Sequence, residues 1–185
     1  MIDETRNPET TEKLGEAILH IASRCRQMRA FGRTKLNKVL FFADFAAFQQ
    51  IGRPVTEATY LKKPNGPVVS QLPKTIERMV RAGFATEVEV QSGPFVENRL
   101  QPLRAARLSV FTSDEIRILD EAIDDVRELN AAELSEMTHE TEAWRLAVMD
   151  GAIPLMTALI PRDAPELTDA ELAYAAELSG AAGGP

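Results

Sequence analysis

Hydrophobic residues are densest over residues 34–52, where they recur at the spacing of one helix face. Half of the phenylalanines of the chain also fall in this stretch and fill the flanks of that face. The pattern predicts a helix that is apolar on most sides, and other elements must surround such a helix. Thr34 can cap the start of this Phe-rich helix, and Gly52-Arg53-Pro54 is expected to end it.

The rest of the first half alternates between helical and extended patterns. Asn7-Pro8-Glu9 is a typical helix start, and Pro73 is compatible with a helix only in its first turn. In chain order, the pattern predicts a helix over residues 8–28, the Phe-rich helix, a short strand over 55–61, a loop over 62–67, a helix over 70–82 that Gly83 ends, and a β-hairpin over 84–90 and 95–103.

The second half is predicted to be helical. Thr112 to Glu115 form a capping box before a helix with an acidic outer face. A short helix is predicted over 131–138; after a bend it continues over 139–149, and it stops at 151–154. A second capping box predicts a last helix over 168–178 before a disordered end. We therefore predict a single, mainly helical α+β domain with a small β-hairpin or short sheet over residues 1–155, and an extension over 156–185.

Composition favours a cytoplasmic protein without a membrane partner. The chain has 185 residues, an acidic N-terminus unlike a signal peptide, and no apolar run near the roughly 20 residues of a membrane span. Its single cysteine, Cys25, excludes an internal disulfide and a multi-cysteine zinc site. Because Cys25 falls on an apolar helix face, we interpret it as a buried hydrophobic residue.

Charge is segregated along the chain. Residues 24–107 hold 15 Lys and Arg against 6 Asp and Glu, whereas the remaining residues hold 6 against 22. This segregation is compatible with a basic face for nucleic acid, a basic face for an acidic protein, or two parts of one domain that attract each other.

No catalytic or cofactor-binding pattern stands out. His20 and His139 are far apart and belong to no cluster of metal ligands, so we predict no metal site. Gly66 lies between Asn65 and Pro67, and proline cannot donate an N–H group to a phosphate, so a nucleotide-binding loop is not predicted. We predict no cofactor and no enzymatic activity.

A DNA-binding alternative follows from the order of the central elements. Two helices, a strand, a helix and a hairpin are also the order of a winged helix-turn-helix, with Ser70, Gln71, Lys74, Arg78 and Arg81 on the recognition helix and residues 91–95 at the wing tip. Against this, no more than two basic residues are adjacent, and Glu77 interrupts the helix face.

Several motifs follow one another in an order typical of one family. They are Lys35-Leu36-Asn37-Lys38-Val39-Leu40-Phe41-Phe42-Ala43-Asp44, then Gly66-Pro67, then Leu134-Ser135 with Thr138-His139 and Trp144. Over residues 12–150 the chain thereby resembles the Panacea family of SocA-like antitoxins, whose pattern is a KLxKLLYFA helix, a Gly-Pro turn and a late LSxxTHxxxxW segment. Val39 and Phe41 depart from this pattern by replacing Leu and Tyr.

The resemblance implies a mainly helical domain with a small β element, found as the antitoxin of toxin–antitoxin pairs and also in phage-associated proteins. We therefore predict an antitoxin that neutralises a cognate toxin by direct protein–protein binding. The alternative is a winged-helix-like transcriptional regulator, with operator DNA as a further partner. The extension either packs on the domain or folds on the toxin, and we predict packing.

The family motif residues are expected to be mainly structural. His139 and Trp144 are five residues apart, which on one continuous helix places them on different sides. We expect Trp144 to bury its ring against the Phe-rich helix, and His139 to donate to a neighbouring carboxylate. The residues in this group are Leu36, Leu40, Phe41, Phe42, Gly66, Pro67, His139 and Trp144.

Charged and polar residues near these motifs are candidates for toxin contact. A buried Asp44 would need a partner, and the available cations or donors are Lys35, Lys38, Arg33 and His139. If these groups pair internally, the partner surface lies elsewhere, on the basic stretch over residues 62–81. The candidate partner-binding residues are Lys35, Lys38, Asp44, Lys62, Lys63, Asn65, Lys74, Arg78 and Arg81.

Overall fold

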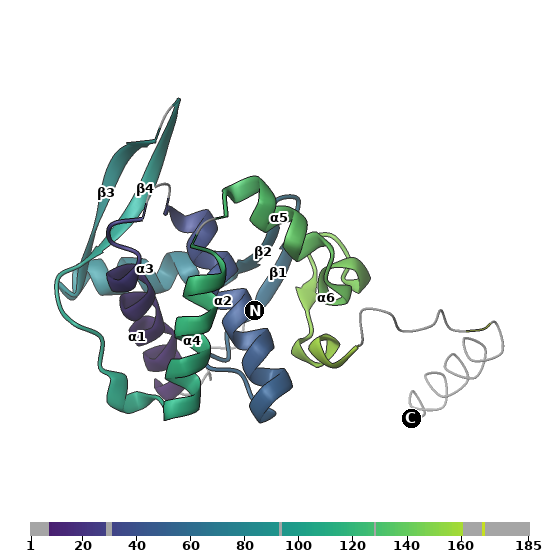
Figure 1. The fold of residues 1–185 in the computed structure, drawn as a ribbon. Helices are drawn as coiled ribbons and strands as arrows, with labels where there is room; N and C mark the ends of the chain where they lie inside the picture. The colour runs from purple at the N-terminus through teal and green to yellow at the C-terminus, as the bar shows by residue number, and fades with distance from the viewer. Residues whose placement is uncertain (1–7, 29–30, 93, 128, 161–167, 169–185) are drawn as a thin grey trace, which may run out of the picture.

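The computed structural model describes residues 8–28, 31–92, 94–127, 129–160 and 168, and within them it is a mainly helical α+β fold, as predicted (Figure 1). The predicted helix over 168–178 and the C-terminal end lie outside the described residues, apart from Thr168. The elements are α1 (Pro8–Arg24), α2 (Arg33–Ile51), β1 (Tyr60–Lys63), β2 (Gly66–Val69), α3 (Leu72–Arg81), β3 (Ala85–Ser92), β4 (Phe95–Pro102), η1 (Leu108–Val110), α4 (Ser113–Asp125), α5 (Ala131–His139), α6 (Glu142–Leu146), β5 (Ala152–Ile153) and η2 (Leu155–Leu159).

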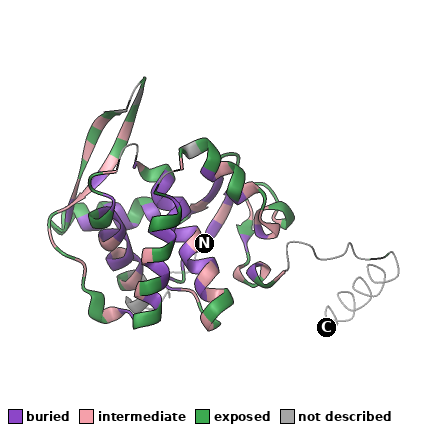
Figure 2. Ribbon diagram, viewed as in Figure 1, coloured by how far each residue is buried: buried purple, intermediate pink, exposed green. Residues whose placement is uncertain are grey.

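Helix α2, the predicted Phe-rich helix, is the central element. It packs against α1, α4, α5, strands β2 and β4, and η2, and most of its residues are buried (Figure 2). The prediction that other elements surround it is therefore confirmed. Gly52 ends the helix with a left-handed φ of 72°, and its amide donates to the Phe48 carbonyl oxygen. The expected Thr34 cap is wrong, because α2 begins at Arg33 and Gly32 occupies the N-cap without a side-chain bond.

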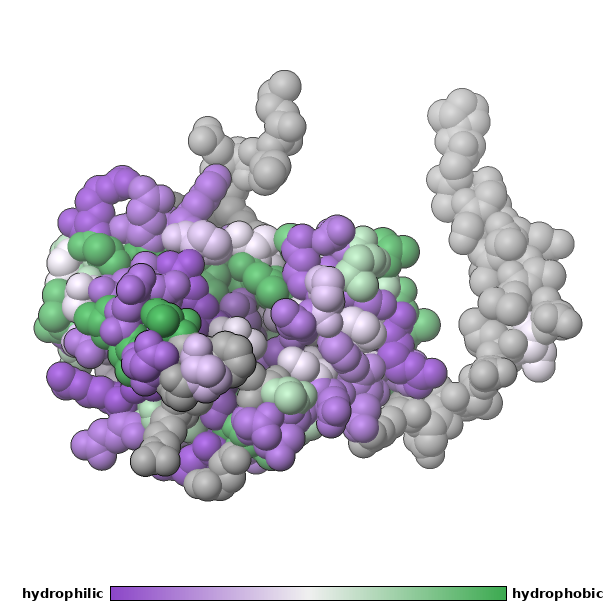
Figure 3. Space-filling model, turned by 90° about the horizontal axis from the view of Figure 1, so that it is seen from above, coloured by the Kyte–Doolittle hydropathy of each residue, from purple (hydrophilic) through white to green (hydrophobic). Residues whose placement is uncertain are grey.

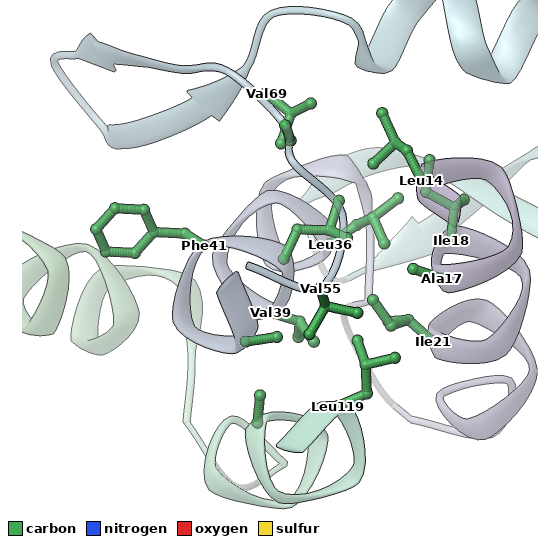
Figure 4. Close-up of a cluster of buried hydrophobic side chains, with 14 of the residues drawn as sticks. Leu14, Ala17, Ile18, Ile21, Leu36, Val39, Phe41, Val55, Val69 and Leu119 are labelled. Carbon is green, nitrogen blue, oxygen red and sulfur yellow. The ribbon is translucent and has the colours of Figure 1, made fainter. Parts of the chain in front are cut away.

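The main hydrophobic core lies between α1, α2 and α4. In Figure 4, Ile21 of α1, Val39 of α2 and Leu119 of α4 converge, and each is fully buried. Cys25 is also buried, as predicted, at 1% exposure. Phe41 points away from this cluster, and its ring lies edge-on to that of Tyr60 at a centroid distance of 5.4 Å. Helix α2 thus contributes side chains to packing on two of its sides.

A three-stranded antiparallel sheet, in the order β2-β1-β5, covers the second side of α2. Tyr60 in the middle strand pairs with Val69 on one side and Ile153 on the other. The predicted loop over 62–67 is wrong, because its ends form two paired strands around a tight turn. The predicted strand over 55–61 is also wrong for most of its length, since Glu57 has a left-handed φ of 52° and only its last residues join β1.

Helix α3 and the β3–β4 hairpin follow the predicted pattern. Gly83 has a φ of 70° and ends α3, and β3 pairs with β4 from Ala85–Pro102 to Ser92–Phe95. The hairpin projects from the body of the molecule (Figure 1). The winged-helix-like order of elements is therefore present, although the β1–β2 hairpin stands between α2 and α3.

The C-terminal part is built from short elements. The capping box at the start of α4 is present, with the Thr112 side chain accepting from the Glu115 amide. Helix α6 starts anew after α5, because the Thr141 hydroxyl accepts from the Trp144 amide and caps it. The helix has ended at Leu146, before the predicted stop at 151–154, and this segment supplies β5. The Lys62 amide donates to the Gly151 carbonyl oxygen at 2.9 Å and so holds this segment beside β1.

Ion pairs connect the basic middle of the chain with its acidic flanks. Glu16 is buried and accepts from Arg104 and Arg107, and similar pairs join Arg53 to Glu115 and Lys63 to Asp150. Burial by itself would raise the pKa of Glu16, but the bonds from Arg104 and Arg107 outweigh it and bring the pKa to about 2. Ion pairs within the domain therefore neutralise part of the segregated charge. Hydrophilic residues cover much of the face seen in Figure 3. Among the described residues, no helix has the length and hydropathy to cross a membrane.

Candidate functional site

The family motifs meet around the side chain of Lys38, which is only 1% exposed. Its Nζ donates to the carbonyl oxygen of Asn65, and to Thr138 Oγ1 at 3.2 Å. Ser135 Oγ donates to the same Asn65 oxygen at 3.1 Å. Because these groups come from α2, the β1–β2 turn and α5, they join three segments at one point. We call Lys38, Asn65, Gly66, Ser135 and Thr138 the Lys38 junction.

Gly66 is required by the geometry of this junction. Its φ of +99° is in a region that L side chains rarely adopt. A Cβ atom added here would lie 1.7 Å from Lys38 Nζ and 2.6 Å from Thr138 Oγ1. The ammonium group therefore occupies the space that any other residue would need for its side chain.

The Lys38 ammonium is held by carbonyl and hydroxyl oxygens. Burial lowers the pKa of Lys38 to about 8. An amine with such a pKa can serve as a base or nucleophile when a substrate reaches it, but the low exposure of this side chain closes it to substrates. The contacts of Lys38 are those of a structural clamp between elements that are distant in sequence.

A second buried amine, that of Lys62, lies against Trp144, the last residue of the LSxxTHxxxxW segment. Lys62 Nζ is 4.1 Å from the centroid of the Trp144 ring, and it donates to the Ala147 carbonyl oxygen at 2.8 Å. The His139 ring stacks on Trp144 at a centroid distance of 3.9 Å and an interplanar angle of 25°. These contacts stabilise α6 against β1 through cation–π and stacking interactions.

The stacked pair corrects two expectations. His139 was expected to donate to a carboxylate, but among the described residues its Nε2 is buried without a hydrogen-bond partner, and its hydrogen bond is with the Pro64 backbone. His139 and Trp144 were expected on different sides of one helix, but α5 ends at His139 and α6 begins after it, so the chain turns and brings the two rings together. Trp144 is half-buried and covers His139 and Lys62. Burial lowers the pKa of His139, and the charges of Lys38 and Lys62 lower it further, against a hydrogen bond with the Pro64 backbone that raises it.

Asp44 is fully buried, and its partners are neutral. The carboxylate accepts from the Thr56 amide at 2.8 Å, from Thr56 Oγ1 at 2.5 Å and from the Tyr60 hydroxyl at 2.7 Å. The expected pairing with a cation is therefore wrong. Burial raises the pKa of Asp44, and the hydrogen bonds from Thr56 and Tyr60 oppose this only in part. This network attaches the segment that enters β1 to the side of α2.

The remaining candidate residues are separated from the junction. Lys35 is buried at 5% exposure. Lys63 Nζ pairs with Asp150 at 2.6 Å, and Arg81 pairs with Glu77 at 2.5 Å along α3. The structure thus brings together Lys38, Lys62, Asn65, Gly66, His139 and Trp144, places Asp44 beside Tyr60, and leaves Lys74, Arg78 and Arg81 exposed on α3. Leu36, Leu40, Phe41 and Pro67 are buried, and Phe42 is half-buried.

Several polar residues of these networks were not among the candidate site residues that the sequence predicted. Asn37 Oδ1 accepts from the Val69 amide at 2.8 Å and so attaches α2 to β2. Ser135 and Thr138 complete the Lys38 junction, and Thr56 and Tyr60 complete the Asp44 network. Asn37, Ser135 and Thr138 could have been found from their place inside the motifs, where small polar residues lie next to positions predicted to be buried. Thr56 and Tyr60 carried no such signal.

The arrangement defines a class of protein: a mainly helical α+β domain whose central helix is fixed to a small sheet and to a late helix by buried polar contacts. Within the described residues, no group of three or more His, Cys, Asp or Glu is placed to hold a metal ion.

A family model described as "Antitoxin SocA-like, Panacea domain" matches residues 36–145. The chain belongs to this family, as the motifs predicted. Searches of curated proteins and of solved structures returned no match.

Proposed function

We propose that this protein is a cytoplasmic antitoxin that neutralises a cognate toxin by direct binding. The observation that carries the proposal is the family match over residues 36–145, which contains every segment of the Lys38 junction. Contacts between the family's own motifs therefore hold the fold of this protein together. We further propose that residues 1–155 form the antitoxin domain and that 156–185 are an extension of it.

The use of the charged motif residues supports a binding role rather than a catalytic one. Lys38, Asp44 and Lys62 are charged groups of a kind that can serve catalysis, and each is buried in internal contacts. A binding protein needs only a stable fold that presents a surface. Neutralisation would then proceed by covering the toxin's active surface, or by holding the toxin in an incompetent state.

Co-expression tests this proposal. The chain is expressed together with the product of each gene encoded beside it, and growth and co-purification are measured. We expect one neighbouring product to arrest growth alone, to be tolerated in the presence of this chain, and to co-purify with it. If no neighbouring product is toxic or co-purifies, the proposal is wrong.

DNA binding is the second candidate, and it rests on α3. Lys74, Arg78 and Arg81 are exposed on this helix, and the β3–β4 hairpin follows it in the position of a wing. The strands of that hairpin carry three glutamates, Glu87, Glu89 and Glu97, against one arginine, so this wing would repel phosphates. Binding of a labelled operator duplex, with affinity that falls steeply with salt, would favour the DNA-binding function.

A further inference from the structure

The turn between β1 and β2 carries the dipeptide Asn65-Gly66. The chain has five asparagines, and Asn65 is the one that glycine follows. The main-chain nitrogen of the residue after an asparagine can attack the carbon of the side-chain amide and close a five-membered ring. Glycine hinders this attack least, because it has no side chain and its backbone is the most adaptable. Asn65 is therefore the asparagine of this chain at which ring closure is sterically easiest.

The side chain of Asn65 is free to reach that nitrogen. Asn65 is exposed, and both of its side-chain contacts from α2 and α5 are made to its main-chain oxygen; among the described residues no hydrogen bond holds its side-chain amide. The side chains of Asn37 and Asn130 are instead held by hydrogen bonds to the main chain. Gly66 and Lys63 form the last pair of the β1–β2 ladder, and end pairs open more easily than inner ones.

Two donors are placed at the oxygen of the peptide bond that contains the attacking nitrogen. Helix α5 packs against β2 and brings Ser135 beside the turn (Figure 1). Ser135 Oγ and Lys38 Nζ both donate to the Asn65 carbonyl oxygen. A peptide nitrogen becomes a nucleophile when it loses its proton, and the negative charge then moves largely onto this oxygen. The ammonium and the hydroxyl stabilise that charge, as the donors of an oxyanion hole do, so the Gly66 N–H group should ionise more readily than in an unfolded chain.

We propose that Asn65 is a self-modification site, which the folded chain converts to aspartate and isoaspartate with Lys38 and Ser135 as activating donors. Hydroxide removes the proton from the Gly66 nitrogen, this nitrogen bonds to Asn65 Cγ, and the Cγ–Nδ2 bond breaks, so that the amide group takes a proton from water and leaves as ammonia. Water then opens the ring. Cleavage of the bond between the nitrogen and Cγ gives aspartate, and cleavage of the bond between the nitrogen and the Asn65 main-chain carbonyl carbon gives isoaspartate. The reaction needs no other reactant and is independent of the antitoxin function.

The two products affect the Lys38 junction differently. Isoaspartate adds one carbon to the main chain, so the carbonyl oxygen of residue 65 cannot keep its place beside both Lys38 and Ser135. Aspartate keeps the length of the main chain and adds a negative charge just after Lys62 and Lys63. We therefore expect the isoaspartate form to have the lower thermal midpoint, and the modification to limit the lifetime of the intact junction.

Incubation of the purified full-length protein, followed by proteolysis and mass spectrometry, measures this conversion. The mass change from amide to acid gives the total at residue 65, and chromatographic separation of the peptides distinguishes the two products. The test variants are Lys38→Met and Ser135→Ala, and Ser70→Ala, which removes an exposed hydroxyl at the end of β2, is the matched control. The same chain kept unfolded in urea gives the rate without the fold.

We expect the folded wild type to convert Asn65 about tenfold or more faster than the chain in urea, because a hydrogen bond from a charged donor changes a rate by about that factor. Lys38→Met should slow the conversion by a similar factor, Ser135→Ala about threefold or more, and Ser70→Ala less than about twofold. Asn130 should stay unmodified over the same time.

The pH dependence gives a readout that a merely structural role would not change. The wild-type rate should rise with pH and flatten above about 8, because burial lowers the pKa of Lys38 to about 8 and a neutral amine is the weaker donor. In Lys38→Met the rise should continue. The other ionisable side chains on the elements that meet here are Lys62 and Lys63 on β1 and Glu133, Glu136 and His139 on α5.

Three results would overturn the proposal. If the folded chain converts Asn65 more slowly than the chain in urea, the fold protects this site. If Lys38→Met and Ser135→Ala both convert at the wild-type rate, the two donors activate nothing; where Lys38→Met does not fold, the rate of Ser135→Ala alone decides. If Asn130 converts as fast as Asn65, the glycine and the donors confer no selectivity.

Discussion

Replacing Gly66 by alanine should destabilise the fold far more than the same change at other left-handed glycines. At a φ of +99° a side chain is strained, at a cost of about 1–3 kcal/mol. The new Cβ would also meet Lys38 Nζ at 1.7 Å. Moving that ammonium breaks its bonds to Asn65 and Thr138, and each bond to a charged group is worth about 1.5–3 kcal/mol. Since such terms are not fully additive, we expect a loss of about 4 kcal/mol in the free energy of unfolding.

Gly52 and Gly83 provide the matched controls. Their φ values are +72° and +70°, and nothing lies within 4 Å of a Cβ added to either. Alanine at these positions should cost only the backbone term of about 1–2 kcal/mol. Urea denaturation followed by circular dichroism measures all three variants. Equal losses at the three glycines would show that Lys38 does not occupy the space beside Gly66, and would refute the junction.

A double-mutant cycle adds a direct test of the contact. In a Lys38→Met background, Gly66→Ala should cost less than in the wild type, because the ammonium that the Cβ displaces is gone. Part of the cost should remain, since Thr138 Oγ1 would still lie 2.6 Å from the new atom.

Three further predictions concern the buried ionisable groups. Burial lowers the pKa of Lys38 to about 8, so between pH 8 and 10.5 the unfolded chain binds more protons than the folded chain. The contribution of Lys38 to stability should therefore rise by about 3 kcal/mol as the pH increases across that window. Urea titrations at several pH values should show this rise in the wild type and not in Lys38→Met. The pKa of Glu16 is lowered to about 2 from 4.5, so its contribution, also about 3 kcal/mol, is complete above pH 4.5 and should be lost as the pH falls toward 2; a Glu16→Gln curve as steep as the wild type in acid would contradict this. Tyr60→Phe removes the donor 2.7 Å from the buried Asp44 carboxylate and should cost about 2 kcal/mol in urea denaturation, whereas a neutral effect would mean that this hydrogen bond is absent.

Local signals in the sequence predicted most helices and one hairpin. Apolar spacing located α2, the capping box located the start of α4, and Gly83 marked the end of α3. Each of these signals lies within a few consecutive residues, so it can be read from the sequence alone. The strands of the central sheet were largely missed, because all three are short and β5 pairs with β1 from far along the chain. Pro64, in the β1–β2 turn, and Pro67, just after it, suggested a loop there, although Pro67 is itself a strand residue.

The candidate site was predicted as a set of motifs but not as a geometry. The motif order indicated that Gly66, His139 and Trp144 belong together with the Lys38 helix. It did not indicate that the ammonium fills the place of a glycine side chain, because that depends on a turn conformation 27 residues away. Asp44 shows the same limit, since charge alone suggested a cation, while the fold supplied hydroxyl and amide donors from residues 56 and 60.

The Lys38 junction also bears on the speed at which the protein unfolds. Lys38 and Thr138 are separated by 100 residues, so closing the loop between them is entropically costly and the contact should form after the folding transition state. Contacts of this kind change the unfolding rate and leave the refolding rate nearly untouched. The junction should therefore raise the barrier to unfolding and lengthen the time for which the native state persists. This time also sets how long the chain resists a protease that cleaves the open state faster than the chain can refold.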